Sequence, residues 1–344
     1  KSDSKSFNDY IEKFYTNQFF PYLKENRIST VIDLGDTFDR RKYVNFAILD
    51  KVRKFYFDEL ANRNIKVHSI VGNHSTYYRN TNDVNSSYLL YGHYDNIEVY
   101  SEATPISIDG TLIDLIPWIN SENHDRTMDF IKKSKAQVAF GHLEVEGFAM
   151  YKNYVAGTGL QPSIFKGYEL VASGHYHHKS NKGNIHYLGA PYEITWNDYD
   201  DPRGFHIFDT ETRDMEFIKN KYRLFEKIYY DDENIDYRSV SGKPYKDKIV
   251  KLIVENKSNV KTFESFLDRL YKSNPIDLII LEDLSEYTAR YSNEEKDDVE
   301  VGNTATFLEE YVDSIPIDHE KKDERLKVKR LLQILYDEAL NTDE

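Results

Sequence analysis

Apolar side chains recur along the first hundred residues in two alternating patterns. Phe, Tyr, Ile and Leu at helical spacing predict helices over residues 7–26 and 45–62. Compact β-branched runs over residues 30–34 and 65–71 predict buried strands, and a glycine follows each of them. This order of helix, strand, helix and strand predicts an α/β fold in which a parallel sheet is covered by helices.

Strands predominate in the pattern beyond residue 96. Three short runs predict a meander over residues 97–100, 106–108 and 111–116, with Asp109-Gly110 as a hairpin turn. A helix is predicted over residues 125–134. Further strands are predicted over residues 136–140, 168–172, 184–188, 204–208 and 215–219. Polar residues follow several of these strands, which is where open α/β sheets bind their ligands.

The composition changes near residue 224. Strand patterns over residues 225–230, 248–254 and 276–281, with a helical pattern over 260–273, predict a small α+β domain. We therefore expect a main domain at 1–224, an α+β capping domain at 225–300 and C-terminal helices at 301–344. The last helical pattern, over 325–340, carries an apolar face that packs either on its own domain or in a groove of a partner.

The composition narrows the class of protein. The 344 residues have a formal net charge of −14, which argues against a passive nucleic-acid coat but not against a nuclease with bound metal ions. Cysteine is absent, so thiolate metal sites are excluded and a reducing compartment is expected. No apolar run approaches ~18 residues, so we expect no membrane span and a cytoplasmic location. Because Lys1 is not Met, we expect the chain to begin inside a longer gene product.

Four glycine-bearing segments carry the candidate chemistry, and each directly follows a predicted strand. They are Gly35-Asp36-Thr37-Phe38-Asp39, Gly72-Asn73-His74, Gly141-His142 and Gly174-His175-Tyr176-His177. Carboxylate, amide oxygen and imidazole together suit Mn²⁺, Fe²⁺ or Zn²⁺. Two such ions about 3.5–4 Å apart can clamp a phosphoryl group for in-line attack. The set therefore predicts a two-metal phosphoesterase.

Each segment taken alone also has an ordinary structural explanation. A Gly-Asp pair after a strand is more often a turn than a ligand, and Asn readily occupies a left-handed turn. Gly92-His93 lacks the strand-end context, so we expect a loop residue there. Gly174-His175-Tyr176-His177 is more specific, because side chains two apart on an extended segment share a face. The order and spacing of all four favour metal binding.

These segments resemble motifs two to five of the calcineurin-like metallophosphoesterases. Further similarity to the SbcD-type DNA-repair nucleases, and most to the recombination endonuclease subunits of large tailed phages, lies in residues 117–120, 147–150, 187–192 and 201–205. The resemblance implies a two-sheet β-sandwich core flanked by helices. It also implies that the α+β domain caps the core and binds DNA, and that the C-terminal helices bind an ATPase.

The resemblance further implies a role for each site residue. Asp36 would bridge two Mn²⁺ ions, and His177 would bind the second of them. Asn73, His142 and His175 would complete the first. His74 would act near the leaving oxygen, as a general acid or by stabilising the transition state.

The same resemblance implies a biological setting. The reaction would be Mn²⁺-dependent exonuclease action at duplex DNA ends and endonuclease action on single strands, in DNA repair, recombination and replication. The implied partners are a coiled-coil ABC-type ATPase of the SbcC type and a second copy of the chain.

Two positions depart from the family pattern. Its first motif, Asp-x-His, does not occur, and residues 1–7 align with the segment that follows it. Ser75 stands where the family has an acidic residue that orients and charges the histidine. We therefore expect reduced turnover in this chain.

For the other polar residues near the motifs, we expect supporting, structural or DNA-contact roles. Asp39 is expected to cap a turn, His178 to be structural, and Glu144 to support the ligands. Arg40 and Arg41 suit phosphate contact or a plain surface role. Contact with DNA fits Tyr151, Lys152 and Tyr154.

Two other functions remain open. The same metal core also serves phosphatases and cyclic-nucleotide phosphodiesterases, although the predicted capping domain and C-terminal helix favour a nuclease. A catalytically weakened DNA-end-binding or assembly subunit is the third alternative, and Ser75 and the missing first motif favour it.

Overall fold

The computed structural model describes residues 4–151, 154–155 and 157–282, and residues 1–282 form one compact unit. The predicted C-terminal helices at 301–344 lie outside the described residues. No described helix is long and apolar enough to span a bilayer.

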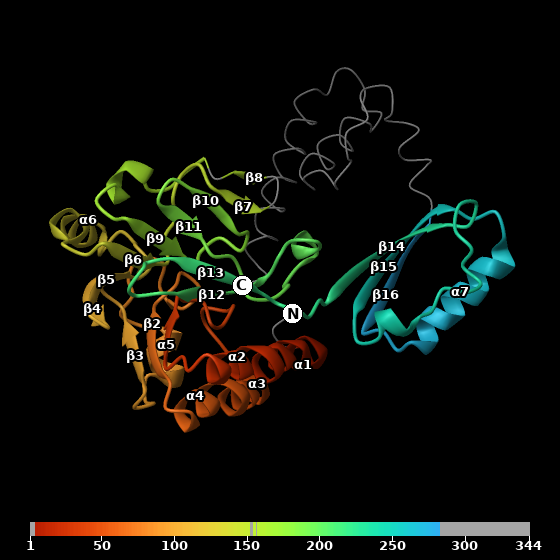
Figure 1. Ribbon diagram of the computed structural model, residues 1–344, viewed down its shortest axis with the longest axis horizontal. Coiled ribbons are helices and arrows are strands. Elements are labelled where there is room, and N and C mark those ends of the chain that lie inside the picture. The colour runs from red at the N-terminus through yellow and green to blue at the C-terminus, as the bar shows by residue number, and fades with distance from the viewer. Residues whose placement is uncertain (1–3, 152–153, 156, 283–344) are drawn as a thin grey trace, which may run out of the picture. The chain divides into compact units, whose positions relative to one another are not determined.

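The first sheet is parallel and has the order β1-β2-β3, from Thr30–Asp33, Lys66–Ile70 and Ile97–Tyr100. Two long helical segments pack against it, as predicted, and each contains a π-helical turn. They comprise α1 (Lys5–Phe14), a π-turn (Tyr15–Phe19) and α2 (Phe20–Glu25), then α3 (Phe46–Val52), a π-turn (Arg53–Phe57) and α4 (Asp58–Asn62). Figure 1 shows α1–α4 gathered beside this sheet, and their buried aromatic rings form one core with Val67 of β2.

The second sheet has six strands in the order β10-β11-β9-β6-β5-β4. Its strands are β4 (Thr104–Ile108), β5 (Thr111–Ile116), β6 (Val138–Gly141), β9 (Leu170–Ser173), β10 (Ser180–Lys182) and β11 (Ile185–Tyr187), and α6 (His124–Lys133) connects β5 to β6. The central strands β5, β6, β9 and β11 are parallel to one another. The described core is therefore the predicted mixed α/β arrangement of sheets and helices.

Three details of the sequence prediction are wrong. The strands at 97–116 are not one meander, because β3 pairs with β2 in the first sheet while β4 and β5 form a hairpin in the second. Strand β1 is only half-buried, because it pairs with β2 alone among the described strands. Gly92 ends a short helix, α5 (Ser86–Tyr91), which the sequence prediction missed.

The longer elements beyond residue 200 follow the predicted pattern. A hairpin of β12 (Gly204–Phe208) and β13 (Met215–Lys219) places Phe205 against Phe19, with ring centroids 5.2 Å apart. Parallel strands β14 (Phe225–Asp231), β15 (Ile249–Asn256) and β16 (Asp277–Glu282) pack with α7 (Val260–Lys272) around their own core. The domain boundary at 224 stays a prediction. Short elements that were not predicted are β7 (Ala149–Tyr151), β8 (Tyr154–Val155) and one-turn 3-10 helices at Pro162–Phe165, Trp196–Asp198 and Lys243–Tyr245.

A buried arginine ties the segment before β12 to the loop after β9. Arg203 donates from Nη2 to the carboxylates of Asp198 and Asp201, both at 2.7 Å, and from Nη1 to the carbonyl oxygen of His177. Its side chain is 4% exposed, and those of the two aspartates are 3% and 5% exposed. His178 contacts Asp201 through Nδ1 at 2.8 Å. This cluster therefore fixes the backbone of the loop that carries His175 and His177.

Replacing Arg203 should destabilise the fold. Arg203→Met keeps much of the side-chain volume but leaves two buried carboxylates without the positive charge of the guanidinium, so the free energy of unfolding is expected to fall by about 3–5 kcal/mol. Urea denaturation measures the change. Arg238→Met is the matched control, because Arg238 pairs with Asp236 while 80% exposed, and no change of midpoint is expected there. Equal midpoints for the Arg203 variant and the unmodified protein would refute this role.

Candidate metal centre

The candidate ligands come from loops at the carboxyl ends of parallel strands in both sheets. Asp36 follows β1 and Asn73 follows β2 in the first sheet. His142 follows β6 and His175 follows β9 in the second. Residues that are up to 139 positions apart in the chain (175 minus 36) thereby meet where the two sheets face each other.

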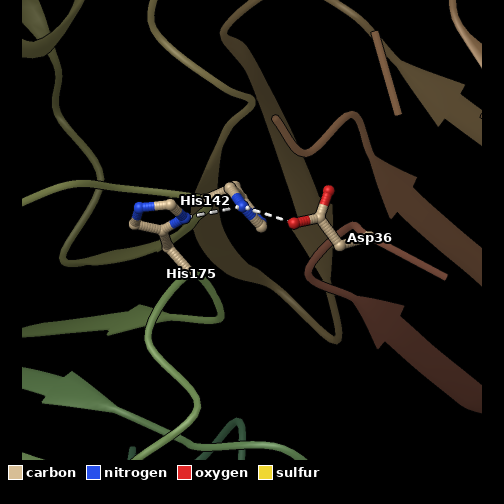
Figure 2. A group of neighbouring side chains, drawn as sticks. All are labelled: Asp36, His142 and His175. Carbon is tan, nitrogen blue, oxygen red and sulfur yellow. Dashed lines mark hydrogen bonds and ion pairs between the residues drawn. The ribbon is translucent and has the colours of Figure 1, made fainter. Parts of the chain in front are cut away.

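Four ligand atoms converge on one point. His142 Nε2 lies 3.1 Å from Asp36 Oδ2 and 2.8 Å from Asn73 Oδ1. His175 Nδ1 lies 3.1 Å from both His142 Nε2 and Asn73 Oδ1. Figure 2 shows Asp36, His142 and His175 turned toward one another from separate loops, and these three are a possible ligand group for a metal ion.

The spacing of these atoms suits a metal ion. Ligand atoms about 2.1 Å from one ion and at right angles around it lie about 3 Å apart. Nitrogen and oxygen lone pairs that face one point repel one another unless protons or a cation lie between them. The donor set of carboxylate, amide oxygen and two imidazoles therefore fits a borderline divalent cation.

Close backbone packing brings the first two loops together. A Cβ on Gly35 would lie 2.8 Å from the backbone nitrogen of Gly72, and a Cβ on Gly72 would collide with the Asp36 carboxylate. Gly35 and Asp36 both have positive φ, at 92° and 58°, a conformation open to glycine and tolerated by aspartate. The glycines therefore permit the close approach of Asp36 and Asn73.

Hydrogen bonding fixes the ring of His142 for metal binding. Its Nδ1 lies 2.7 Å from the carbonyl oxygen of Leu34, so Nδ1 carries a proton and donates it. Its Nε2 therefore faces the other ligands, which is the usual arrangement for a metal-binding histidine. Burial acts to lower the pKa of His142, but the Asp36 carboxylate raises it above its ordinary value.

The close packing of these ligands also shifts the pKa values of Asp36 and His175. Burial by itself would raise the pKa of Asp36, but the neighbouring His142 and His74 hold it well below its ordinary value. Burial, and then His142, lower the pKa of His175 to about 3, so this ring is neutral near pH 7. A neutral imidazole beside an ionised carboxylate is the protonation state that metal ligation requires.

Among the described residues, no hydrogen bond or ion pair links His177 to Asp36, Asn73, His142 or His175. His177 lines, together with Asp36, a cavity of about 510 Å³ that runs along β1 and β12. Burial lowers the pKa of His177, and Asp36 and His74 are among the charges that act on it. Its role as a ligand of a second ion stays a prediction.

His74 lies beside the cluster and is oriented by backbone groups. The backbone N–H of His74 donates to Asp36 Oδ1 at 2.8 Å. The Nδ1 atom of its ring lies 2.7 Å from the carbonyl oxygen of Asp39. The Asp39 carbonyl therefore orients the His74 ring, while Ser75 is buried at 1% exposure. Asp39 contributes its backbone carbonyl to this contact.

Two residues near the centre were not among the predicted site residues. Asp33 is half-buried and accepts hydrogen bonds from the Gly35 backbone, Thr37 and Ser69, which fixes the turn that presents Asp36. Trp118 lies against the histidines, with its ring centroid 5.2 Å from that of His175. A carboxylate at the very end of β1 was the available signal for Asp33, whereas Trp118 appeared only within a family motif.

The other polar residues predicted near the motifs lie in different surroundings. The Arg40 guanidinium lies over the Tyr43 ring at 5.0 Å. The Glu144 carboxylate lies 3.4 Å from the Thr158 hydroxyl and lines a second cavity next to Trp118. The side chains of Tyr151, Lys152 and Tyr154 lie outside the described part of the chain.

Comparisons with known proteins agree with this geometry. The model of the calcineurin-like phosphoesterase family matches residues 6–179. Exonuclease subunit 1 of Enterobacteria phage T4 is 37% identical over 301 residues, which cover 87% of this chain and 85% of that protein. A solved structure of an archaeal phosphodiesterase has 12% identity over 59% of this chain and 94% of that one, with a TM-score of 0.30, too low to support an argument.

Metal binding should compete with a proton on His142. Because Asp36 raises the pKa of His142, protein without metal holds that proton at pH values above the ordinary 6.5. Mn²⁺ affinity is therefore expected to rise with pH through that raised pKa, by up to about tenfold per unit, with release of a proton. Calorimetry in two buffers of different ionisation enthalpy measures the release.

Asp36→Asn removes the charge that raises this pKa. Its proton release should move to lower pH, and its Mn²⁺ affinity should also fall because a ligand is lost. Asp39→Asn makes the same change at an exposed carboxylate and should behave as the unmodified protein. An unchanged pH profile in Asp36→Asn would contradict this account of His142.

Proposed function

Because the chain belongs to the calcineurin-like phosphoesterase family, we propose that it is a Mn²⁺-dependent DNA nuclease that uses two metal ions. The observation that carries the proposal is the convergence of Asp36, Asn73, His142 and His175 on one point. The 37% identity to a phage exonuclease subunit supports DNA as the substrate, rather than a small phosphate ester.

Each site residue has a defined task in this proposal. Asn73, His142 and His175 would hold the first ion, and the Asp36 carboxylate would contribute to both ions. The ions would polarise the phosphodiester and lower the pKa of a bound water. His74 would donate a proton, or a hydrogen bond, to the leaving oxygen, and the Asp39 carbonyl keeps its Nδ1 engaged so that Nε2 is available.

His177 would hold the second ion together with Asp36. Support comes from the cavity of about 510 Å³ along β1 and β12, since both Asp36 and His177 line it.

The proposed partners are a coiled-coil ABC-type ATPase and a second copy of the chain, in the host cytoplasm. The name of the phage relative, a subunit, supports an assembly. Exposed apolar side chains on α3 and α5 support a dimer surface: Phe46 is 83% exposed, and Tyr88 and Leu89 are each 66% exposed. The proposed ATPase-binding helix at 325–340 lies outside the described residues.

Removal of a metal ligand tests the nuclease proposal. His175→Ala should lose Mn²⁺ binding and cleave DNA on the order of a hundredfold more slowly or worse. His93→Ala is the control, because His93 is an exposed histidine after a glycine, outside the cluster. Mn²⁺-dependent degradation of linear duplex DNA and nicking of plasmid DNA measure the rates.

The same assay separates the alternative functions. A phosphatase would hydrolyse p-nitrophenyl phosphate faster than DNA, and a DNA-end-binding subunit would bind DNA ends without cleaving them. Either outcome, or full DNA cleavage by His175→Ala, would refute the proposal.

Ser75 allows a second test. Ser75→Asp would place a carboxylate beside His74, and we expect turnover of DNA to rise on the order of tenfold, because an acidic neighbour stabilises the charged imidazole. Ser75→Asn is the control of equal size without charge. A rate for Ser75→Asp no higher than that for Ser75→Asn would show that the Asp39 carbonyl already provides all the orientation that His74 needs.

A further inference from the structure

A second cavity of about 280 Å³ lies beside the metal cluster. Trp118 links the two, because it lines this cavity and its ring packs on those of His175 and His142, at centroid distances of 5.2 and 6.1 Å. The volume of this cavity is just below the range of small-ligand sites, about 300–1,000 Å³, so the cavity suits a single planar ring system. The rest of its lining is Ile119, Asn120, Ser121, His124, Glu144, Gly159 and Leu160.

Buried asparagines hold Trp118 in a fixed position. The carbonyl oxygen of Trp118 accepts hydrogen bonds from Asn82 Nδ2 at 2.9 Å and Asn123 Nδ2 at 3.0 Å. Asn120 joins the two, since its Nδ2 donates to Asn82 Oδ1 and its backbone N–H to Asn123 Oδ1. The backbone N–H of Trp118 donates to the carbonyl oxygen of Val71, which directly follows β2, so these hydrogen bonds hold the backbone of Trp118. A fixed aromatic wall costs little entropy when a ring binds to it.

The chemistry of the lining selects for a base rather than a phosphate. Glu144 brings a carboxylate, which would repel a phosphate but accepts hydrogen bonds from the amino groups of adenine, cytosine or guanine. Among the described residues, the Thr158 hydroxyl donates a hydrogen bond to the Glu144 carboxylate at 3.4 Å, which is long and weak. A base that stacks on Trp118 would lie next to the ions that hold its phosphate.

We propose that this cavity is a nucleobase site, in which an amino-bearing base next to the scissile phosphate stacks on Trp118 and donates to Glu144. The inference rests on the proposed nuclease function, because it assumes a nucleotide substrate. It adds a preference of that nuclease for adenine, guanine or cytosine over thymine at one position. Stacking supplies affinity for any base, and Glu144 supplies the preference.

Binding of single nucleotides tests the site without requiring turnover. In the presence of Mn²⁺, 2′-deoxyadenosine 5′-monophosphate should bind about tenfold or more tightly than 2-deoxyribose 5-phosphate, which lacks the base. In Trp118→Ala the two probes should bind alike, and Trp118→Phe should keep most of the difference. Trp196→Phe, at the other of the two tryptophans, is the control. Calorimetry measures all four proteins.

Glu144→Gln tests the base preference separately. The unmodified protein should bind the adenine nucleotide severalfold more tightly than thymidine 5′-monophosphate, and the variant should narrow that difference, because its amide can also donate to thymine. Equal binding of base-bearing and base-free probes by the unmodified protein would overturn the inference. A base preference that persists in protein inactive on DNA would instead count against the nuclease proposal and leave the base site standing.

Discussion

The architecture depends on one electrostatic constraint, which is that four lone-pair-bearing atoms face a single point between two sheets. The Asp36 carboxylate and the His142 imidazole lie 3.1 Å apart, with Asn73 and His175 packed against them. Such a cluster is costly to bury unless protons or a metal ion neutralise it. The low pKa of Asp36 and the high pKa of His142 both result from this constraint.

Much of the surrounding structure holds these groups in place. Asp33 fixes the turn after β1, the Leu34 carbonyl fixes the tautomer of His142, and Gly35 and Gly72 permit backbone contact. The positive φ of Asp36 is local strain of the kind that concentrates at functional sites. These contacts limit how far the ligands can move without metal, so a cation meets a largely preformed site.

Two buried polar clusters hold the segments next to the ligands in place. Arg203, with its two aspartates, holds the backbone carbonyl of His177, so the loop after β9 is anchored from behind. Three asparagines hold Trp118 on the other side. Each cluster is held by several hydrogen bonds, which restrict its buried polar groups to one arrangement, and among the described contacts only Arg203 Nε in the first cluster has no partner. The clusters therefore restrain the loop after β9 and the segment after β5, which both border the site.

The sequence by itself determined the order of most helices and strands, because the spacing of apolar residues is a local signal. It also determined the residue types of the centre, because Gly-Asp, Gly-Asn and Gly-His pairs directly after strands can be recognised locally. Only the tertiary structure decided that β3 pairs with β2 in the first sheet and not with β4. It also decided that the Asp39 carbonyl orients His74 and that Trp118 packs against His142 and His175. Strand partners and backbone contacts join residues far apart in the chain, and no local pattern records which of two sheets a strand enters or which carbonyl a side chain meets.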